Sequence, residues 1–219
     1  MRYLYLLPAA ILVPVIHEWV KALVSTAQGD PAPRNHGYMT ANPFKFFEPI
    51  GFLFVMLFGF GWGRPVPTTA LHYKDRQMGI ILTYTIPVVV NLLLGVAAVI
   101  GVNALATSAF GPGDWDFRMF FVLAHFPFWT SDISQIGILL LANFAFVNIN
   151  LALFNLIPVY PLAANKLLIT FSRADNIARF NHYEKPMQII LILLLAFGII
   201  PNVLAPISEI IVRMAWGIF

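Results

Sequence analysis

The chain has 219 residues, of which 59% are hydrophobic and only 11% are charged, and its mean hydropathy is +0.79. About a quarter of the residues in a soluble domain are charged, so this composition excludes intrinsic disorder and argues against a water-soluble globule. At about 20 apolar residues per crossing, the chain has room for roughly four to six membrane spans.

The charge balance and the lack of cysteine narrow the classes of function further. Lys plus Arg number 13 and Asp plus Glu number 10, which gives a net charge of +3. In a membrane protein this excess is explained by cytoplasmic loops that face anionic lipid, so we predict membrane lipid and no nucleic acid as a partner. The absence of cysteine excludes disulfides, thiol catalysis and thiolate metal sites.

The first predicted helix covers roughly residues 4–24. Its basic start at Arg2 and its short apolar core are similar to a signal peptide. However, His17, Glu18 and Lys21 interrupt the apolar run before any cleavage site, and the residues that follow match a cleavage site poorly. We therefore expect an uncleaved first helix that keeps these three residues.

The next apolar segment, residues 44–62, follows a loop rich in Pro and Gly. It is short and broken, with Glu48 and Pro49 near its start and several glycines further on. Irregular backbone at membrane depth is tolerated only against other protein, so we predict a re-entrant or interfacial hairpin here.

Three longer apolar segments predict three further spans, at residues 78–105, 133–159 and 187–211. We expect the last span to kink at Pro201 and Pro206, and a short helix that ends near Phe171 to precede it. Polar loops separate these segments at residues 61–76, 106–132 and 172–185. The predicted fold is an all-α polytopic membrane protein of about four to five spans plus the hairpin, in a single domain over residues 1–219.

Loop charge sets the predicted orientation, because Lys and Arg are enriched in cytoplasmic loops. The loops at 61–76 and 172–185 each carry three of these residues, namely Arg64, Lys74 and Arg76 in the first and Arg173, Arg179 and Lys185 in the second. This orientation puts residues 17–21 and the segment Asn155–Pro161 at the cytoplasmic ends of their helices, at the same membrane depth. We expect an integral, multi-pass protein of a bacterial cell membrane, with its site near the cytoplasmic side.

Two polar clusters are the candidate functional residues. Ionisable groups such as His17 and Glu18 inside a spanning helix are costly and usually functional. Alternatively, this helix end meets water and Lys21 extends to the headgroups. In the second cluster Asn155 is followed by two prolines, which break the helix and expose an extended strip that another extended peptide could pair with. The alternative there is a plain helix end followed by a turn.

These clusters and three further motifs resemble the site-2 proteases, the intramembrane zinc metalloproteases of peptidase family M50. The segment His17–Lys21 reads HEWVK and falls on the HExxH position of the family. The segments that follow in the same order are Asn42–Gly51 for NPxxxxDPxG, Gly61–Pro67 for GWAKPVP, Asn91 for the Asn of Gly-Pro-x-x-Asn, and Asn155–Leu162 for the start of NLLPIPPLDG. The order and spacing of the motifs agree from about residue 10 to residue 170, which is most of the chain.

The resemblance implies a metal site that this sequence does not complete. In the family, both His residues of HExxH and the Asp of LDG bind zinc, and the Glu acts as general base. His17 is therefore the one retained ligand position and Glu18 holds the general-base position, whereas Lys21 and Ala163 occupy the other two ligand positions. A single imidazole beside an ammonium group cannot hold zinc, so we expect no cofactor.

The first functional hypothesis is a pseudoprotease, a non-catalytic homologue that binds the helices of single-span membrane protein clients without cleaving them. In this hypothesis Asn155, Pro158 and Pro161 contact the client backbone, and Asn91 lines the pocket. Lys21, one helical turn from the general-base position, forms an ion pair there and replaces the charge of the metal.

Two alternatives stay open. An active intramembrane zinc metalloendopeptidase requires replacement ligands, and the remaining histidines are all predicted in loops, at His36, His72, His125 and His182. A small channel or transporter would use the Asn-rich span between Asn143 and Asn155 as a polar path, although helix–helix hydrogen bonds in lipid give the same pattern.

Overall fold

The computed structural model describes residues 2–110, 117–125, 132–172 and 183–217, and within these ranges all regular secondary structure is helical. Helices long and apolar enough to cross a membrane number four in the described part of the chain: α1 (Arg2–Ala27), α4 (Arg76–Phe110), α6 (Ile133–Phe154) and α10 (Ile199–Trp216). The predicted all-α polytopic membrane fold is confirmed.

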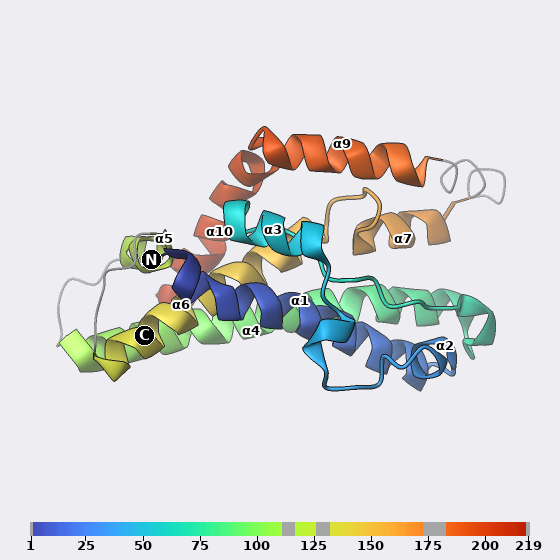
Figure 1. Ribbon diagram of the computed structural model, residues 1–219, viewed down its shortest axis with the longest axis horizontal. Coiled ribbons are helices and arrows are strands. Elements are labelled where there is room, and N and C mark those ends of the chain that lie inside the picture. The colour runs from blue at the N-terminus through green and yellow to red at the C-terminus, as the bar shows by residue number, and fades with distance from the viewer. Residues whose placement is uncertain (1, 111–116, 126–131, 173–182, 218–219) are drawn as a thin grey trace.

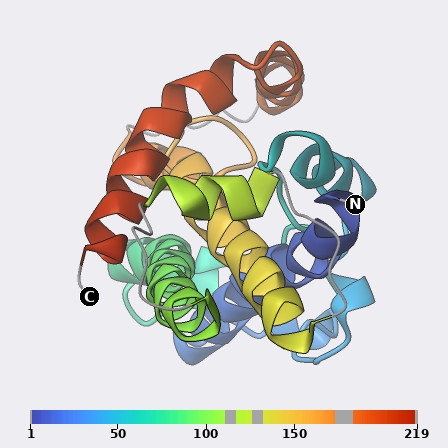
Figure 2. The same cartoon turned by 90° about the vertical axis from the view of Figure 1, so that its left-hand side faces the viewer.

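Helix α6 lies at the centre of the bundle, packed against α1 and α4, and α10 packs against α4 and α6 (Figure 1, Figure 2). Small residues let helix backbones approach closely in membranes. Gly95 of α4 has this role against α6, since a Cβ atom there would lie 2.6 Å from the side chain of Ile149 and 3.1 Å from its backbone nitrogen. This close approach fixes how α4 and α6 sit against each other, and both helices carry residues of the site.

The chain between α1 and α4 forms the predicted hairpin. Its regular elements are α2 (Ala32–Asn35), η1 (Pro43–Lys45), α3 (Pro49–Phe58) and η2 (Ala70–His72). Helix α3 has 10 residues and rises about 15 Å, half the thickness of the hydrocarbon core, so it is too short to span. After α3, residues 59–69 return without regular secondary structure.

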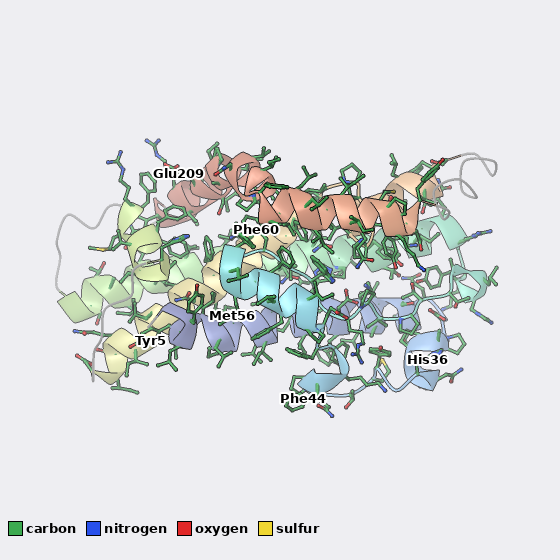
Figure 3. All side chains as sticks on the ribbon, turned by 45° about the horizontal axis from the view of Figure 1, so that its top comes forward. Tyr5, His36, Phe44, Met56, Phe60 and Glu209 are labelled. Carbon is green, nitrogen blue, oxygen red and sulfur yellow. The ribbon has the colours of Figure 1, made fainter. Side chains whose placement is uncertain are left out.

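Glycines let the two arms of this hairpin touch. A Cβ atom on Gly51 would lie 2.0 Å from the carbonyl oxygen of Trp62, and one on Gly61 would lie 2.1 Å from the carbonyl oxygen of Gly51. Beyond the contact, Phe60 is buried against Phe154 of α6; Figure 3 labels Phe60, and Met56 on α3 before it. The hairpin is therefore packed onto the bundle along its length.

The structure corrects two predicted boundaries. Helix α4 continues to Phe110, and α5 (Arg118–His125) occupies part of the segment predicted as a loop at residues 106–132. Helix α5 forms because its apolar residues recur at helical spacing and bury Phe120 and Leu123 in the core. The span predicted at residues 133–159 ends at Phe154, and the short helix after it is α7 (Ala163–Thr170).

The last predicted span consists of two helices. Helix α9 (Glu184–Ala196) is separated from α10 by Gly198, whose φ of +71° is left-handed and ends a helix readily at glycine. Pro201 lies in the first turn of α10 and Pro206 lies inside it, so the chain breaks at the glycine and not at these prolines. Figure 1 shows α9 on the same side of the bundle as α3 and α7.

Candidate functional site

His17 begins a chain of polar side chains that crosses three helices. It is buried in α1, and its Nδ1 donates to Oδ1 of Asn91 on α4 at 2.9 Å. The amide nitrogen of Asn91 in turn donates to Oδ1 of Asn148 on α6, also at 2.9 Å. In the neutral ring a proton on Nδ1 leaves Nε2 as an acceptor, so these bonds fix the tautomer of His17.

Glu18 and Lys21 form an ion pair next to His17. The Nζ atom of Lys21 lies 2.5 Å from Oε2 of Glu18, and each side chain is only 7% exposed. The same Oε2 atom accepts the backbone N–H of Val66 at 2.8 Å, and the ammonium lies over the ring of Tyr84, 5.7 Å from its centroid. Each charge therefore has a partner, as burial requires.

The segment that supplies Val66 is held against α1 at both ends. Gly63 permits the close approach, since a Cβ atom there would lie 3.1 Å from Cγ of Glu18. Further along, the backbone N–H of Thr69 donates to Asp30 at 2.7 Å. Asp30 is fully buried and also accepts hydrogen bonds from the Ser25 hydroxyl and from the backbone N–H of residue 32. The carboxylates of Glu18, in α1, and Asp30, just after α1, thus hold residues 64–69 against this helix. These residues form one wall of the site and are here called the wall.

A hydroxyl network joins the same end of α1 to α4. The Ser25 hydroxyl lies 2.9 Å from the Tyr73 hydroxyl, which accepts from the hydroxyl of Thr83 at 3.1 Å. Burial raises the pKa of Tyr73 above its ordinary value, and the hydrogen bonds to Ser25 and Thr83 act in the opposite direction. The network keeps the wall segment and the first turns of α4 together.

The segment after α6 is not the extended strip that the sequence predicts. Residues 155–162 form successive turns. Asn155 organises them, because its Oδ1 accepts the backbone N–H of Ala163 at 3.2 Å, its own carbonyl oxygen accepts that of Ala164 at 3.0 Å, and its amide nitrogen donates to Leu151. The side chain of Asn155 therefore shapes the start of α7, and Pro158 lies exposed beyond it.

The three ligand positions of the family motifs all border the same stretch of α4. His17 bonds to Asn91, Lys21 lies over Tyr84, and Ala163 packs in one apolar cluster with Val88. These contacts fall on two to three successive turns of α4, at about 3.6 residues per turn. The two polar clusters that the sequence placed at one membrane depth thus pack against the same part of α4.

The other histidines lie away from this stretch or outside the described part of the chain. His36 is exposed and contacts the Ala32 carbonyl in its own short helix, and His72 is exposed in η2. His125 was predicted in a loop but is the last residue of α5. The centroid of its ring lies 4.7 Å from that of Phe146. His182 falls outside the described residues. Within the described ranges, no three side chains of His, Cys, Asp or Glu lie close enough together to hold a metal ion.

An open groove, here called the lysine groove, runs beside the ion pair. It consists of two adjoining hollows of about 220 and 190 Å³, and its polar lining is Lys21, Thr68, Tyr73, Tyr84, Tyr160, Lys166, Thr170 and Glu184. Lys166 of α7 pairs with Glu184 of α9 at 3.2 Å and lies over the ring of Tyr160, 5.5 Å from its centroid. Burial raises the pKa of Tyr160, and the charge of Glu184 adds to this while that of Lys21 opposes it.

Sequence reasoning missed most of this groove. Of its polar residues only Lys21 and Tyr160 lie in segments that match a family motif. The available indications were a lysine inside the short helix α7 and a tyrosine, Tyr84, inside an apolar span. Neither indicates a partner, because the residues come from elements far apart in sequence.

Comparison with known proteins finds a significant relative. The chain is 30% identical over 165 residues to a protein of Bacillus subtilis (strain 168) named "Putative zinc metalloprotease YwhC", and the match covers 75% of this chain and 67% of the relative. The chain belongs to the zinc metalloprotease family of YwhC. No family model matches it, and no solved structure matches it significantly.

Membership of the YwhC family agrees with the motif order described above. Together with the four long apolar helices, it makes the chain an M50-like integral membrane protein. The residues that depart from the family motifs are Lys21 of α1 and Ala163 of α7. They pack against the same part of α4 as the retained His17.

Proposed function

We propose that this protein is a pseudoprotease, a non-catalytic member of its family that binds the helices of single-span membrane proteins without cleaving them. The observation that carries the proposal is the buried ion pair between Lys21 and Glu18. Lys21 stands where the motif has its second zinc-binding His, and its ammonium contacts the carboxylate that would act as general base.

The donor set supports this reading. Catalytic zinc sites use three protein ligands and keep one position open. Here His17 offers one nitrogen, Ala163 offers no donor, and Lys21 brings a positive charge that repels a cation. The described residues do not fit a three-ligand zinc site.

The charge balance explains how the site tolerates the loss. A family site with a divalent ion, one ligand carboxylate and one general-base carboxylate has a net charge of zero. Glu18 and Lys21 also sum to zero, so in this proposal Lys21 replaces the metal as the electrostatic partner of Glu18. A buried carboxylate needs an opposite charge or several hydrogen bonds to offset its loss of hydration, and Lys21 supplies the charge for Glu18.

In this proposal the client is bound at the cytoplasmic side of a bacterial cell membrane, the side assigned from loop charge. The exposed Pro158, the half-buried Pro161 and the lysine groove beside it are the surfaces open to the client. Asn91 and Asn155 act indirectly, because Asn91 orients His17 and Asn155 shapes the turns that carry the prolines.

Metal content and cleavage test the proposal together. The purified full-length protein should contain no stoichiometric zinc and should leave a single-span client intact with or without a chelator. Lys21→His combined with Ala163→Asp restores the ligands of the family motif, and we expect this variant to bind zinc. Zinc in the unmodified protein that is lost on His17→Ala, together with cleavage that a chelator abolishes, would overturn the proposal.

An active zinc metalloendopeptidase is the second candidate, favoured by the retained His17 and Glu18 and by the name of the relative. It requires ligands from other parts of the chain, and the test above detects it. The channel hypothesis has less support, because the amides of Asn143, Asn148 and Asn155 donate to backbone carbonyls in their own helix.

A further inference from the structure

We propose that the lysine groove binds the C-terminal end of a client's membrane helix, through the backbone carbonyl oxygens that this end leaves without partners. The inference rests on the client-binding function proposed above and specifies which part of a client is recognised. Three observations lead to it: the spare hydrogen-bond donors of the two lysines, the neutral charge, and the chemistry of the wall.

The two lysines of the groove have more N–H donors than the bonds that they make to the two glutamates. An ammonium group carries three N–H donors, and Glu18 and Glu184 each accept one bond from a lysine. Lys21 and Lys166 thus keep further donors, and the hydroxyl of Tyr160 lies in the same hollow. A ligand that fits must supply acceptors.

The groove carries no net charge. Lys21 is neutralised by Glu18, and Lys166 is neutralised by Glu184. A fully charged carboxylate or phosphate would compete with these acidic partners for the same ammonium groups. An uncharged acceptor, such as a peptide carbonyl, can bind without breaking either ion pair.

The wall at residues 64–69 supplies few donors of its own. Pro65 and Pro67 have no N–H, and the N–H groups of Arg64, Val66 and Thr69 already donate to Phe46, Glu18 and Asp30. A strand pairs along a sheet edge through alternating donors and acceptors. The wall cannot provide that pattern, so recognition depends on the lysine and tyrosine side chains opposite.

The C-terminal end of an α-helix matches these properties. Its last four carbonyl groups lack partners within the helix, and the end carries about half a negative charge. The N-terminal end presents N–H groups instead, and these cannot accept a hydrogen bond from Lys21, Lys166 or Tyr160. The groove should therefore discriminate between the two ends of the same helix.

Two synthetic peptides test whether the groove recognises these carbonyl groups. Both are single spans of leucine and alanine with capped, uncharged termini; one keeps its last four carbonyl groups, and in the other these four are replaced by thioamides, whose sulfur is a weak acceptor. Binding to the full-length protein is measured by fluorescence anisotropy in phosphatidylcholine nanodiscs. We expect the peptide that keeps the carbonyl groups to bind about tenfold more tightly.

Variants assign the preference to the groove. Lys166→Met should abolish the preference, Lys166→Arg should preserve most of it, and Tyr160→Phe should weaken binding of the preferred peptide about threefold. The matched control is Lys45→Met, because Lys45 also lies over a tyrosine ring, that of Tyr38, but is exposed outside the groove. This control should bind both peptides as the unmodified protein does.

The possible failures are distinguishable. Equal binding of the two peptides, or a preference that survives Lys166→Met in folded protein, overturns the inference but leaves client binding in place. Binding of neither peptide contradicts the proposed function itself. An effect of Lys166→Met that appears only when phosphatidylglycerol is added identifies the ligand as an anionic lipid headgroup, which also overturns the inference.

Discussion

Removing one partner of the Lys21–Glu18 pair should destabilise the protein far more than removing both. Lys21→Met leaves the Glu18 carboxylate at 7% exposure with the Val66 N–H as its remaining partner. Breaking a buried ion pair from one side costs about 3–5 kcal/mol, because a charge is left uncompensated. Glu18→Gln should cost a similar amount, since the buried ammonium of Lys21 then loses its counter-charge.

The double variant, Lys21→Met with Glu18→Gln, contains neither charge. The Gln side chain still offers an oxygen to the Val66 N–H, and the Met side chain fills the space of the lysine stem over Tyr84. We therefore expect the double variant to lie within about 1–2 kcal/mol of the unmodified protein, with a coupling energy of at least about 3 kcal/mol.

The assay is equilibrium unfolding in mixed micelles with increasing dodecyl sulfate, applied to all four proteins of the cycle. The control cycle uses Lys166→Met and Glu184→Gln, whose side chains are 33% and 29% exposed. That pair should couple by no more than about 1 kcal/mol. Additive single effects at Lys21 and Glu18 would refute the reasoning that the two charges neutralise each other in a buried site.

Three further predictions concern the surroundings of the site. Asp30→Asn should destabilise the protein by about 2 kcal/mol, because an amide offers one oxygen where the buried carboxylate accepts three hydrogen bonds. Tyr73 has its pKa raised by burial, so its contribution to stability holds below its ordinary pKa, near 10, and declines as the pH rises above that value; Tyr73→Phe should reduce this decline in an unfolding series from pH 9 to 11. Gly51→Ala should destabilise the protein by about 1–3 kcal/mol, because its Cβ would lie 2.0 Å from the Trp62 carbonyl oxygen.

Each of these predictions has an outcome that contradicts it. A stable Asp30→Asn variant would mean that the wall segment is held by other contacts. An unchanged alkaline transition in Tyr73→Phe would assign that transition to another group. Gly137→Ala is the matched control for Gly51, because nothing lies within 4 Å of its Cβ position; inside helix α6 it should stabilise the protein by up to about 1 kcal/mol and not destabilise it.

Loop charge and motif order predicted the central feature of the site. They place His17 and the segment at Asn155 at one membrane depth, and the structure brings the residues of both onto neighbouring turns of α4. The two segments can meet because long apolar helices run side by side; the membrane depth and the cytoplasmic side stay predictions from loop charge. The partners within the site follow from how α1, α4 and α6 face each other, and that rotation is set by close contacts such as Gly95 on Ile149.

The sequence was less informative where several local signals compete. Pro201, Pro206 and Gly198 all disfavour a continuous last span, but only the left-handed backbone of Gly198 breaks it. Asn155 and the prolines after it are compatible with an extended strip and with turns. The hydrogen bonds from Ala163 and Ala164 to Asn155, which decide for turns, depend on where α7 begins.

The prolines on either side of Val66 affect how long a partner can stay. A bound peptide that lay along this wall would find no continuous row of backbone N–H donors to pair with. Its binding would depend on a few side-chain contacts, which can break one at a time. Such a surface favours quick exchange over permanent capture, and it gives a misfolded neighbour no template on which to extend a sheet.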